Sequence, residues 1–492
     1  MAILAALKFL VSMVFSSAFF MFVFLPIVLL LIGITKQKIH NTILLIASIF
    51  FYSWGGVSHT LILFISIIAN YVFGILIYNS KGRKAKLFLG IAISINIGLL
   101  VYFKYFNFFL DNINSGLLFF GKDLIEYRRV ILPIGISFFT FQAMSYVIDV
   151  YRKTTPLQRN IFDLALYISL FPQLIAGPIV RYFDIAGQLK KRTLSIDKAA
   201  SGIQRFIFGL AKKVIIANSM ADIADKIFAL PVDDISQGVA WLGIIAYTLQ
   251  IYFDFSGYSD MAIGLGRIFG FSFPENFNYP YISGSIKEFW RRWHISLSSW
   301  FRDYLYIPLG GSRKGVIRTY INLTIVFLAT GIWHGASWNF VIWGLFHGVF
   351  IVIERIGLDK ILVKTWKPIQ IGYTLLLVII GWVFFRIESF NEAILFLGKM
   401  SSFYDSDIPK MFVAEYLNYK IIFLLIFAIL YSFRVFRWII KIIKSWFLKR
   451  KHENLYQIVF QSSKFIISIS LFILTVLYLS ASTYNPFIYF RF

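Results

Sequence analysis

The stretch GIWHGASWNFVIWGLFHG, residues 331–348, is almost entirely apolar, aromatic or small, yet it carries two histidines. The pattern Gly-x-x-His-Gly occurs in it twice, around His334 and around His347. Ionisable side chains are costly inside a bilayer and usually line a functional path where they occur. The stretch therefore predicts a membrane-embedded segment and, at the same place, a candidate site for chemistry.

The whole chain shares this apolar character. Of its 492 residues, 59% are hydrophobic and 15% are charged, whereas soluble domains carry about 25% charged residues. Apolar runs recur at 9–34, 42–54, 60–78, 87–103, 371–385, 421–433 and 465–480. We expect an all-α, polytopic membrane protein with roughly ten to twelve spanning or re-entrant helices. The first run is longer than the apolar part of a signal peptide, so we expect a retained helix there.

The charge pattern fits a membrane surface. The net charge is +24, and the Lys and Arg clusters lie between apolar runs, as they do in cytoplasmic loops. Anionic lipid head groups are therefore the expected partner, and no nucleic acid is expected, because no separate basic domain is visible.

Several kinds of chemistry are excluded by the sequence. The chain has no cysteine, which removes disulfides, thiolate metal sites and cysteine-bound acyl intermediates. Walker A, Gly-x-Ser-x-Gly and His-Glu-x-x-His patterns are absent as well. We therefore expect no bound metal and no permanently bound cofactor.

We expect one membrane-embedded domain, with 131–348 as a catalytic core and 1–130 and 349–492 as peripheral spans. In the core, apolar stretches alternate with polar, aromatic and glycine-rich segments that are too short or too polar to span cleanly. Backbone that is broken at membrane depth survives only where protein or a water-filled cavity satisfies it. A cavity with re-entrant helices around it is the resulting prediction.

The segment KEFWRRWHISLSSWFRDYLYIPLGGSR, residues 287–313, has two interpretations. On one continuous helix Trp290, Trp293 and Leu297 would share a face, which is typical of an amphipathic helix anchored at the membrane interface. That interpretation explains the Trp and Arg residues but leaves His294 without a reason, because an interfacial helix gains little from a histidine. His294 is therefore a second candidate for chemistry.

The two histidines of the opening stretch have a similar ambiguity. Gly331 and Gly335 flank His334 and could simply form a close helix-packing face. On a continuous helix the imidazoles of His334 and His347 would point about 140° apart. They could share one site only if the chain breaks between Gly335 and Asn339. We expect His334 to be functional and His347 to be structural.

A buried neutral imidazole can accept a proton from a hydroxyl near neutral pH. This property suits a base that activates an alcohol against a thioester or ester. It would equally suit a proton relay in a transporter, so the residues alone leave both classes open.

The sequence resembles the membrane-bound O-acyltransferases and, within them, the bacterial alginate O-acetylation branch. The resembling segments cover most of 132–345, together with two short pieces near the ends of the chain. They are LPIGISFFTFQAMSYVIDVYR, FPQLIAGPIVR, YFDFSGYSDMAIGLGRIFGF, PENFNYPY, EFWRRWHISLSSWFRDYLYIPLGGSR and GIWHGASWNFVIWG, with FYSWGG at 51–56 and PFIYFRF at 486–492.

The resemblance implies a helical fold around a central tunnel in the cell inner membrane. It implies acyl transfer from cytoplasmic acetyl-CoA to an extracytoplasmic polysaccharide acceptor, completed by an extracytoplasmic hydrolase-like partner. The near-invariant histidine of the family falls on His334, and its second, more variable position falls on His294. We expect both to be catalytic. The expected substrate-binding residues are Arg302, Asp303, Trp333, Trp290 and Glu288. Of these, Arg302 and Asp303 would help to bind the donor or to stabilise the developing oxyanion.

Four alternatives remain beside this expectation. A sibling enzyme would transfer D-alanine from a carrier protein to teichoic acid, and a peptidoglycan acceptor would replace an alginate-like polymer within the same branch. A proton-coupled transporter using His294 and His334 is weaker, because proton pumps usually also show buried Asp or Glu residues mid-span. A purely structural scaffold would leave the charged middle of the chain unexplained.

Overall fold

The computed structural model describes residues 13–402, 411–450, 452–481 and 484–488. Its regular structure is helical, and β-structure in these ranges is limited to one isolated bridge between Ile235 and Met411. The fold is therefore all-α, as the sequence predicts. The expected retained helix at 9–34 lies partly outside the described residues, which contain η1 (Phe20–Phe24) and α2 (Leu25–Ile34) of it.

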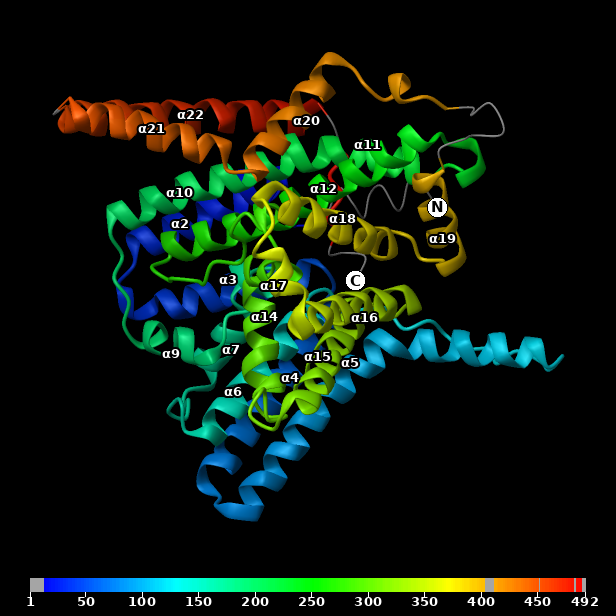
Figure 1. The fold of residues 1–492 in the computed structure, drawn as a ribbon. Coiled ribbons are helices and arrows are strands. Elements are labelled where there is room, and N and C mark those ends of the chain that lie inside the picture. The colour runs from blue at the N-terminus through cyan, green and yellow to red at the C-terminus, as the bar shows by residue number, and fades with distance from the viewer. Residues whose placement is uncertain (1–12, 403–410, 451, 482–483, 489–492) are drawn as a thin grey trace. The chain divides into compact units, whose positions relative to one another are not determined.

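The described residues pack into two compact units. The first unit comprises 13–203 and 262–274, and the second comprises Gln204–Met261 with the described residues from Glu275 onward. The helices of the first unit are coloured blue to green in Figure 1. They are η1, α2, α3 (His40–Trp54), α4 (Val57–Asn79), α5 (Gly82–Phe119), α6 (Ile136–Arg152), α7 (Ile161–Ser169), α8 (Phe171–Leu174) and α9 (Tyr182–Lys190).

The second unit contains the residues expected to carry chemistry. Its helices are α11 (Asn218–Phe228), α13 (Ile286–Arg292), α14 (Ile295–Phe301), α15 (Val316–His334), α16 (Trp338–Ile353), α17 (Asp359–Leu362), α18 (Lys367–Arg386), α19 (Phe390–Ser401), α20 (Tyr419–Ser432), α21 (Val435–Lys449) and α22 (Glu453–Ala481). Two further helices, α10 (Ile196–Ala211) and α12 (Gln237–Ile268), have residues in both units. The division of the chain into a core at 131–348 and peripheral spans stays a prediction.

Several of these helices have the length and composition of membrane spans. Seven helices qualify among the described residues: α4, α5, α12, α15, the segment Trp338–Leu362, α18 and α22. The pair α20 and α21 qualifies only together, with a 65° bend between its two halves. The chain is therefore a multi-pass membrane protein.

Two interruptions in the helices determine where the candidate histidines lie. The segment 287–313 is not one continuous helix, so the shared face expected for Trp290, Trp293 and Leu297 is wrong. α13 ends at Arg292, and His294 adopts the left-handed conformation (φ 44°, ψ 53°) before α14 starts. Trp290 and Trp293 are buried within the protein, which also contradicts an interfacial anchoring role for them.

The second interruption lies inside the opening stretch. α15 ends at His334, Gly335 is extended, and Ser337 caps α16 by accepting a hydrogen bond from the Asn339 backbone N–H at 3.2 Å. The chain therefore breaks between Gly335 and Asn339, which meets the condition for the two imidazoles to reach one site. The break allows α15 and α16 to run side by side, as Figure 1 shows.

Glycines make this antiparallel pair unusually close. A Cβ on Gly331 would collide with the backbone carbonyl of Phe340, and one on Gly344 would collide with the carbonyl of Phe327. Backbones approach this closely only where both partners present small residues. The packing interpretation of the Gly331 region is thus confirmed, and it places His334 at the end of a helix that is held tightly against its neighbour.

Candidate functional site

His334 is buried in an aromatic cage at the end of α15. Its side chain is 2% exposed. The ring centroid lies 5.0 Å from that of Trp333, 5.0 Å from that of Trp343 and 5.2 Å from that of Phe385, all in edge-to-face geometry. Rings from α15, α16 and α18 therefore fix the position of the imidazole from three sides.

His347 shares one wall of this cage. Its ring centroid lies 5.1 Å from that of Trp343, whose indole also contacts His334. The break at Gly335 thus brings both histidines of the opening stretch to one indole. No hydrogen-bond partner for either ring nitrogen of His347 occurs among the described residues, and its ring stacks on that of Phe289 at 6.3 Å. This environment suits a packed ring, and the structural role expected for His347 stays a prediction.

His294 is held by polar contacts. It is fully buried, and its Nδ1 lies 3.2 Å from the Oδ1 of Asn276. The same oxygen accepts hydrogen bonds from the backbone N–H of Ser296 at 3.2 Å and from its hydroxyl at 2.9 Å. The Asn276 amide nitrogen in turn donates to the Ser259 hydroxyl at 3.1 Å. Desolvation by burial lowers the pKa of His294 to about 3, so the ring is neutral at physiological pH.

One indole links the two candidate catalytic histidines. The ring centroid of Trp333 lies 5.9 Å from that of His294 and 5.0 Å from that of His334. Residues that are far apart in the sequence, beside α14 and on α15, therefore converge on Trp333. The structure brings together three of the predicted site residues at this point.

A cavity of about 440 Å³ lies near this cluster, but His294, Trp333 and His334 are not among the residues that line it. It touches Leu297, three residues after His294, and Thr330, four residues before His334, so it comes within one helical turn of both histidines. The predicted residues Trp290 and Arg302 line it. The indole of Trp290 separates the cavity from His347 and Trp343, with ring centroids 5.4 and 5.6 Å away.

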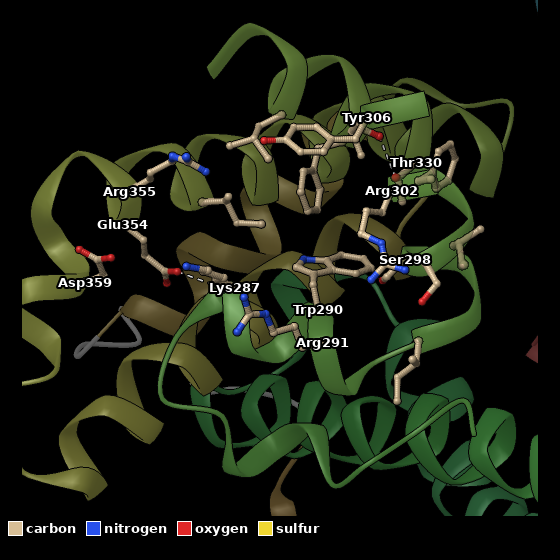
Figure 2. Close-up of a pocket in the computed structure, with 18 residues that line it drawn as sticks. Lys287, Trp290, Arg291, Ser298, Arg302, Tyr306, Thr330, Glu354, Arg355 and Asp359 are labelled. Atoms are coloured by element: carbon tan, nitrogen blue, oxygen red, sulfur yellow. Dashed lines mark hydrogen bonds between the residues drawn. The ribbon is translucent and has the colours of Figure 1, made fainter. Parts of the chain in front are cut away.

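The polar lining of the cavity is mainly basic. Figure 2 shows Glu354, Arg355 and Asp359 at one end, Ser298, Arg302 and Thr330 at the other, and Trp290 between them. Lys287 and Arg291 add two further cations from α13. Four cations against two carboxylates favour an anionic ligand at the polar rim, while Phe327 and its apolar neighbours suit a less polar group deeper inside.

The remaining predicted residues lie at the edge of this arrangement. Asp303 pairs with Arg302, with 2.7 Å between the carboxylate and Nε. Glu288 accepts from the Gly284 backbone N–H at 2.8 Å and pairs with Arg292, so it stabilises the start and body of α13. Neither Asp303 nor Glu288 is among the residues that line the cavity.

Sequence reasoning missed the residues that hold His294 and α13. Asn276 and Ser259 lie in segments that looked distinctive but had no assigned role. Glu354 is 1% exposed and accepts from the backbone N–H groups of Ile286 and Lys287 at 2.6 and 3.0 Å, which caps α13. The available signal was a polar side chain in an apolar setting, but nothing in the sequence revealed its tertiary partner.

No group of His, Asp and Glu residues suited to a metal ion occurs among the described residues.

The architecture and this site define a polytopic membrane protein whose buried histidines lie beside a basic cavity. A model of the membrane-bound O-acyltransferase family matches residues 158–391. The chain is 43% identical to the probable alginate O-acetylase AlgI of Pseudomonas putida, over 98% of this chain and 100% of that protein. It is 34% identical to the peptidoglycan O-acetyltransferase of Helicobacter pylori, over 98% of each chain.

A more distant likeness is 28% identity to the teichoic acid D-alanyltransferase of Bacillus subtilis, over 75% of this chain and 95% of that one. The chain belongs to the membrane-bound O-acyltransferase family, and it is an acyltransferase.

Proposed function

We propose that this chain is a membrane O-acetyltransferase. It would pass acetyl groups from cytoplasmic acetyl-CoA across the cell inner membrane for the O-acetylation of an extracytoplasmic polysaccharide. The observation that carries the proposal is His334, buried at the break between α15 and α16 and linked through Trp333 to His294. The near full-length likeness to relatives named for alginate and peptidoglycan O-acetylation supports acetyl as the acyl group.

His334 acts as the general base in this proposal. An acceptor hydroxyl oxygen attacks the thioester carbonyl carbon, and an imidazole nitrogen of His334 takes the hydroxyl proton as the new C–O bond forms. The C–S bond then breaks, the proton passes to the leaving sulfur, and free CoA and an acetyl ester result. His294 assists by binding the donor or by stabilising the oxyanion that develops on the carbonyl oxygen.

The basic cavity is the proposed entry for the donor. Lys287, Arg291, Arg302 and Arg355 are exposed to solvent. They would attract the phosphates of CoA and bind them through charge-assisted hydrogen bonds. The apolar surface around Trp290 and Phe327 would cover the rest of the donor and exclude water. Asp303 would orient Arg302 through their ion pair. Trp333 would separate the two imidazoles. Glu288 would contribute indirectly, by stabilising α13.

The acceptor side of the proposal requires a partner. An extracytoplasmic hydrolase-like protein would hand the acetyl group to the polymer, since seven helices among the described residues have the length and composition of membrane spans. Alginate-like exopolysaccharide and peptidoglycan are both acceptors of the proposed class, in agreement with the names of the two near full-length relatives.

The test is the release of free CoA from acetyl-CoA by the purified full-length protein in detergent. It compares the wild type with His334→Ala and with His452→Ala, a matched control because His452 is exposed. Each is assayed with and without a soluble hydroxyl acceptor. Release that requires His334 and tolerates loss of His452 is the expected result.

Two other outcomes would overturn parts of the proposal. Consumption of a carrier-bound D-alanyl group, with acetyl-CoA left intact, would replace the donor by that of the teichoic acid enzymes. Equal release by wild type and His334→Ala, at equal thermal stability, would remove His334 from the chemistry.

A further inference from the structure

The orientation of the Asn276 amide follows from its neighbours. The oxygen and nitrogen of a side-chain amide look alike, and only the hydrogen-bond network tells them apart. The backbone N–H of Ser296 lies 3.2 Å from the atom assigned as Oδ1, and a backbone N–H can only donate. The amide oxygen must therefore face Ser296, and the amide nitrogen must face the Ser259 hydroxyl, 3.1 Å away.

This orientation determines the tautomer of His294. Its Nδ1 lies 3.2 Å from the same amide oxygen, which can only accept. If Nδ1 carried the lone pair, two acceptors would face each other in a site from which water is excluded. Nδ1 must therefore carry the hydrogen, and in a neutral imidazole Nε2 then carries the lone pair.

The aromatic contacts of the ring are compatible with this arrangement. They are edge-to-face contacts, to Phe255 at 4.6 Å and to Trp333 at 5.9 Å between centroids. The lowered pKa of His294, caused by desolvation, keeps the ring neutral, so one nitrogen always retains a lone pair near pH 7. The backbone carbonyl of Asn276 also accepts from the Ile295 N–H at 3.0 Å, which fixes the position of His294 along the chain.

We infer that Asn276 is a positioning residue, which locks His294 in the Nδ1–H tautomer and thereby makes Nε2 its proton-accepting atom. The inference deepens the proposed function and rests on it for the catalytic meaning of that atom. It narrows the role of His294: a ring in this state accepts a proton or a hydrogen bond through Nε2. It cannot serve as an imidazolium that stabilises an oxyanion. Asn276 itself touches no reacting atom in this scheme.

A simpler role for Asn276 has to be separated from this one. Its side-chain and backbone oxygens accept from the N–H groups of Ser296 and Ile295, so the residue also caps α14. Loss of the cap alone would lower stability and leave the protonation of His294 unaffected. The decisive readout is therefore the tautomer of His294, together with the pH profile.

The first measurement is 15N NMR of the full-length protein, labelled with [15N]histidine and reconstituted in lipid. The six histidines of the chain make the spectrum sparse, and a His294→Gln sample assigns the signals of His294. Nitrogen shifts separate protonated from unprotonated ring nitrogens, so the expected wild-type result near pH 7 is a protonated Nδ1 and an unprotonated Nε2. A protonated Nε2 in the wild type would overturn the inference.

Three variants separate positioning from capping. Asn276→Leu removes the acceptor, and we expect loss of the fixed tautomer and a fall in kcat on the order of 10²-fold at unchanged KM for acetyl-CoA. Asn276→Asp keeps an acceptor oxygen, so it should retain Nδ1–H and recover part of kcat. Its negative charge should raise the pKa of His294 and move the acid limb of the kcat profile to higher pH. Ser296→Ala removes one donor to the same oxygen and should leave the tautomer unchanged.

Failure of this inference and failure of the proposed function would give different experimental results. If the tautomer is as expected but His294→Gln releases CoA at the wild-type rate, Asn276 still positions the ring, and the proposed role of His294 in acetyl transfer is lost. If Asn276→Leu retains the wild-type tautomer, the inference is wrong, whatever the activity.

Discussion

The two candidate catalytic histidines lie at similar breaks between helices but are held by different means. His294 occupies the turn between α13 and α14 and is oriented by the amide of Asn276. His334 ends α15 and is surrounded by the rings of Trp333, Trp343 and Phe385. A hydrogen bond fixes which nitrogen carries the proton, whereas aromatic packing fixes where the ring lies. The first site should respond to changes in polarity and the second to changes in shape.

The largest expected effect separates His334 from His347, which both contact Trp343. His334→Ala should lower the rate of CoA release on the order of 10³-fold or more, because it removes the proposed general base. His347→Leu should leave the rate within about tenfold, because an apolar side chain of similar size can replace a ring whose nitrogens have no partner among the described residues. Both rates are measured at saturating acetyl-CoA.

A comparable loss in the two variants would contradict this assignment. Thermal unfolding of both proteins in the same detergent provides the control, since a collapse of the aromatic cluster would lower both transitions together. His347 would then join the catalytic residues rather than the packing.

The next effect tests whether shape positions His334. Gly331→Ala should destabilise the protein by about 1–3 kcal/mol, because the added methyl group meets the carbonyl of Phe340 and overpacked cores lose stability on this scale. The measurement is the midpoint of thermal unfolding, followed by activity below that midpoint. Gly372→Ala on α18 is the matched control, since no atom of the described residues outside its own helix backbone lies within 4 Å of where its Cβ would stand. This control should be neutral or slightly stabilising.

An unchanged midpoint for Gly331→Ala would mean that α15 and α16 can separate without cost. The aromatic cage would then not depend on close helix packing, and the contrast between the two histidines would lose its basis.

The sequence predicts the helical class well, because long apolar runs can be satisfied in a bilayer only by helices or closed barrels. It also singles out His334 as a candidate, since an ionisable side chain in an apolar stretch is energetically costly and usually has a function. A break between Gly335 and Asn339 was the condition for His334 and His347 to reach one site, and the structure meets this condition. Gly310 and Gly311 both adopt positive φ in the turn that precedes α15, a conformation that glycine adopts at little cost.

The tertiary partners could not be predicted in this way. The contact between Asn276 and His294 depends on the left-handed turn at His294. The sequence does not locate that turn, because only a small share of residues other than glycine adopt this conformation, even though histidine is enriched among them. The cap that Glu354 supplies to α13 joins positions on different helices. The helical periodicity of a sequence describes one helix at a time. At 287–313 it predicted one continuous helix, but the chain turns at His294 between α13 and α14.

A smaller effect is expected at the rim of the cavity. Arg302→Gln should raise the KM for acetyl-CoA about two- to fivefold at nearly unchanged kcat, because a partly exposed cation contributes modestly to binding an anion. The difference should shrink as salt is added, since screening weakens exposed charge interactions. Arg313→Gln is the control, because Arg313 is exposed and does not line the cavity. Equal KM changes in the two variants would indicate a general effect of net charge.

The smallest expected effect concerns the ratio of kcat between wild type and His294→Gln, which should not change with pH. Burial lowers the pKa of His294 to about 3, so the folded protein protonates this ring only far below neutral pH. From about pH 5 to about pH 9 the ring stays neutral, and the ratio of kcat between wild type and His294→Gln should not vary with pH. Any acid limb in that range must come from another group and should appear in both proteins. A ratio that falls toward 1 as the pH is lowered through 6 would show that His294 titrates within reach of solvent. The polar arrangement around Asn276 would then have to open during turnover, and the two histidine sites would differ in mobility as well as in the way they are held.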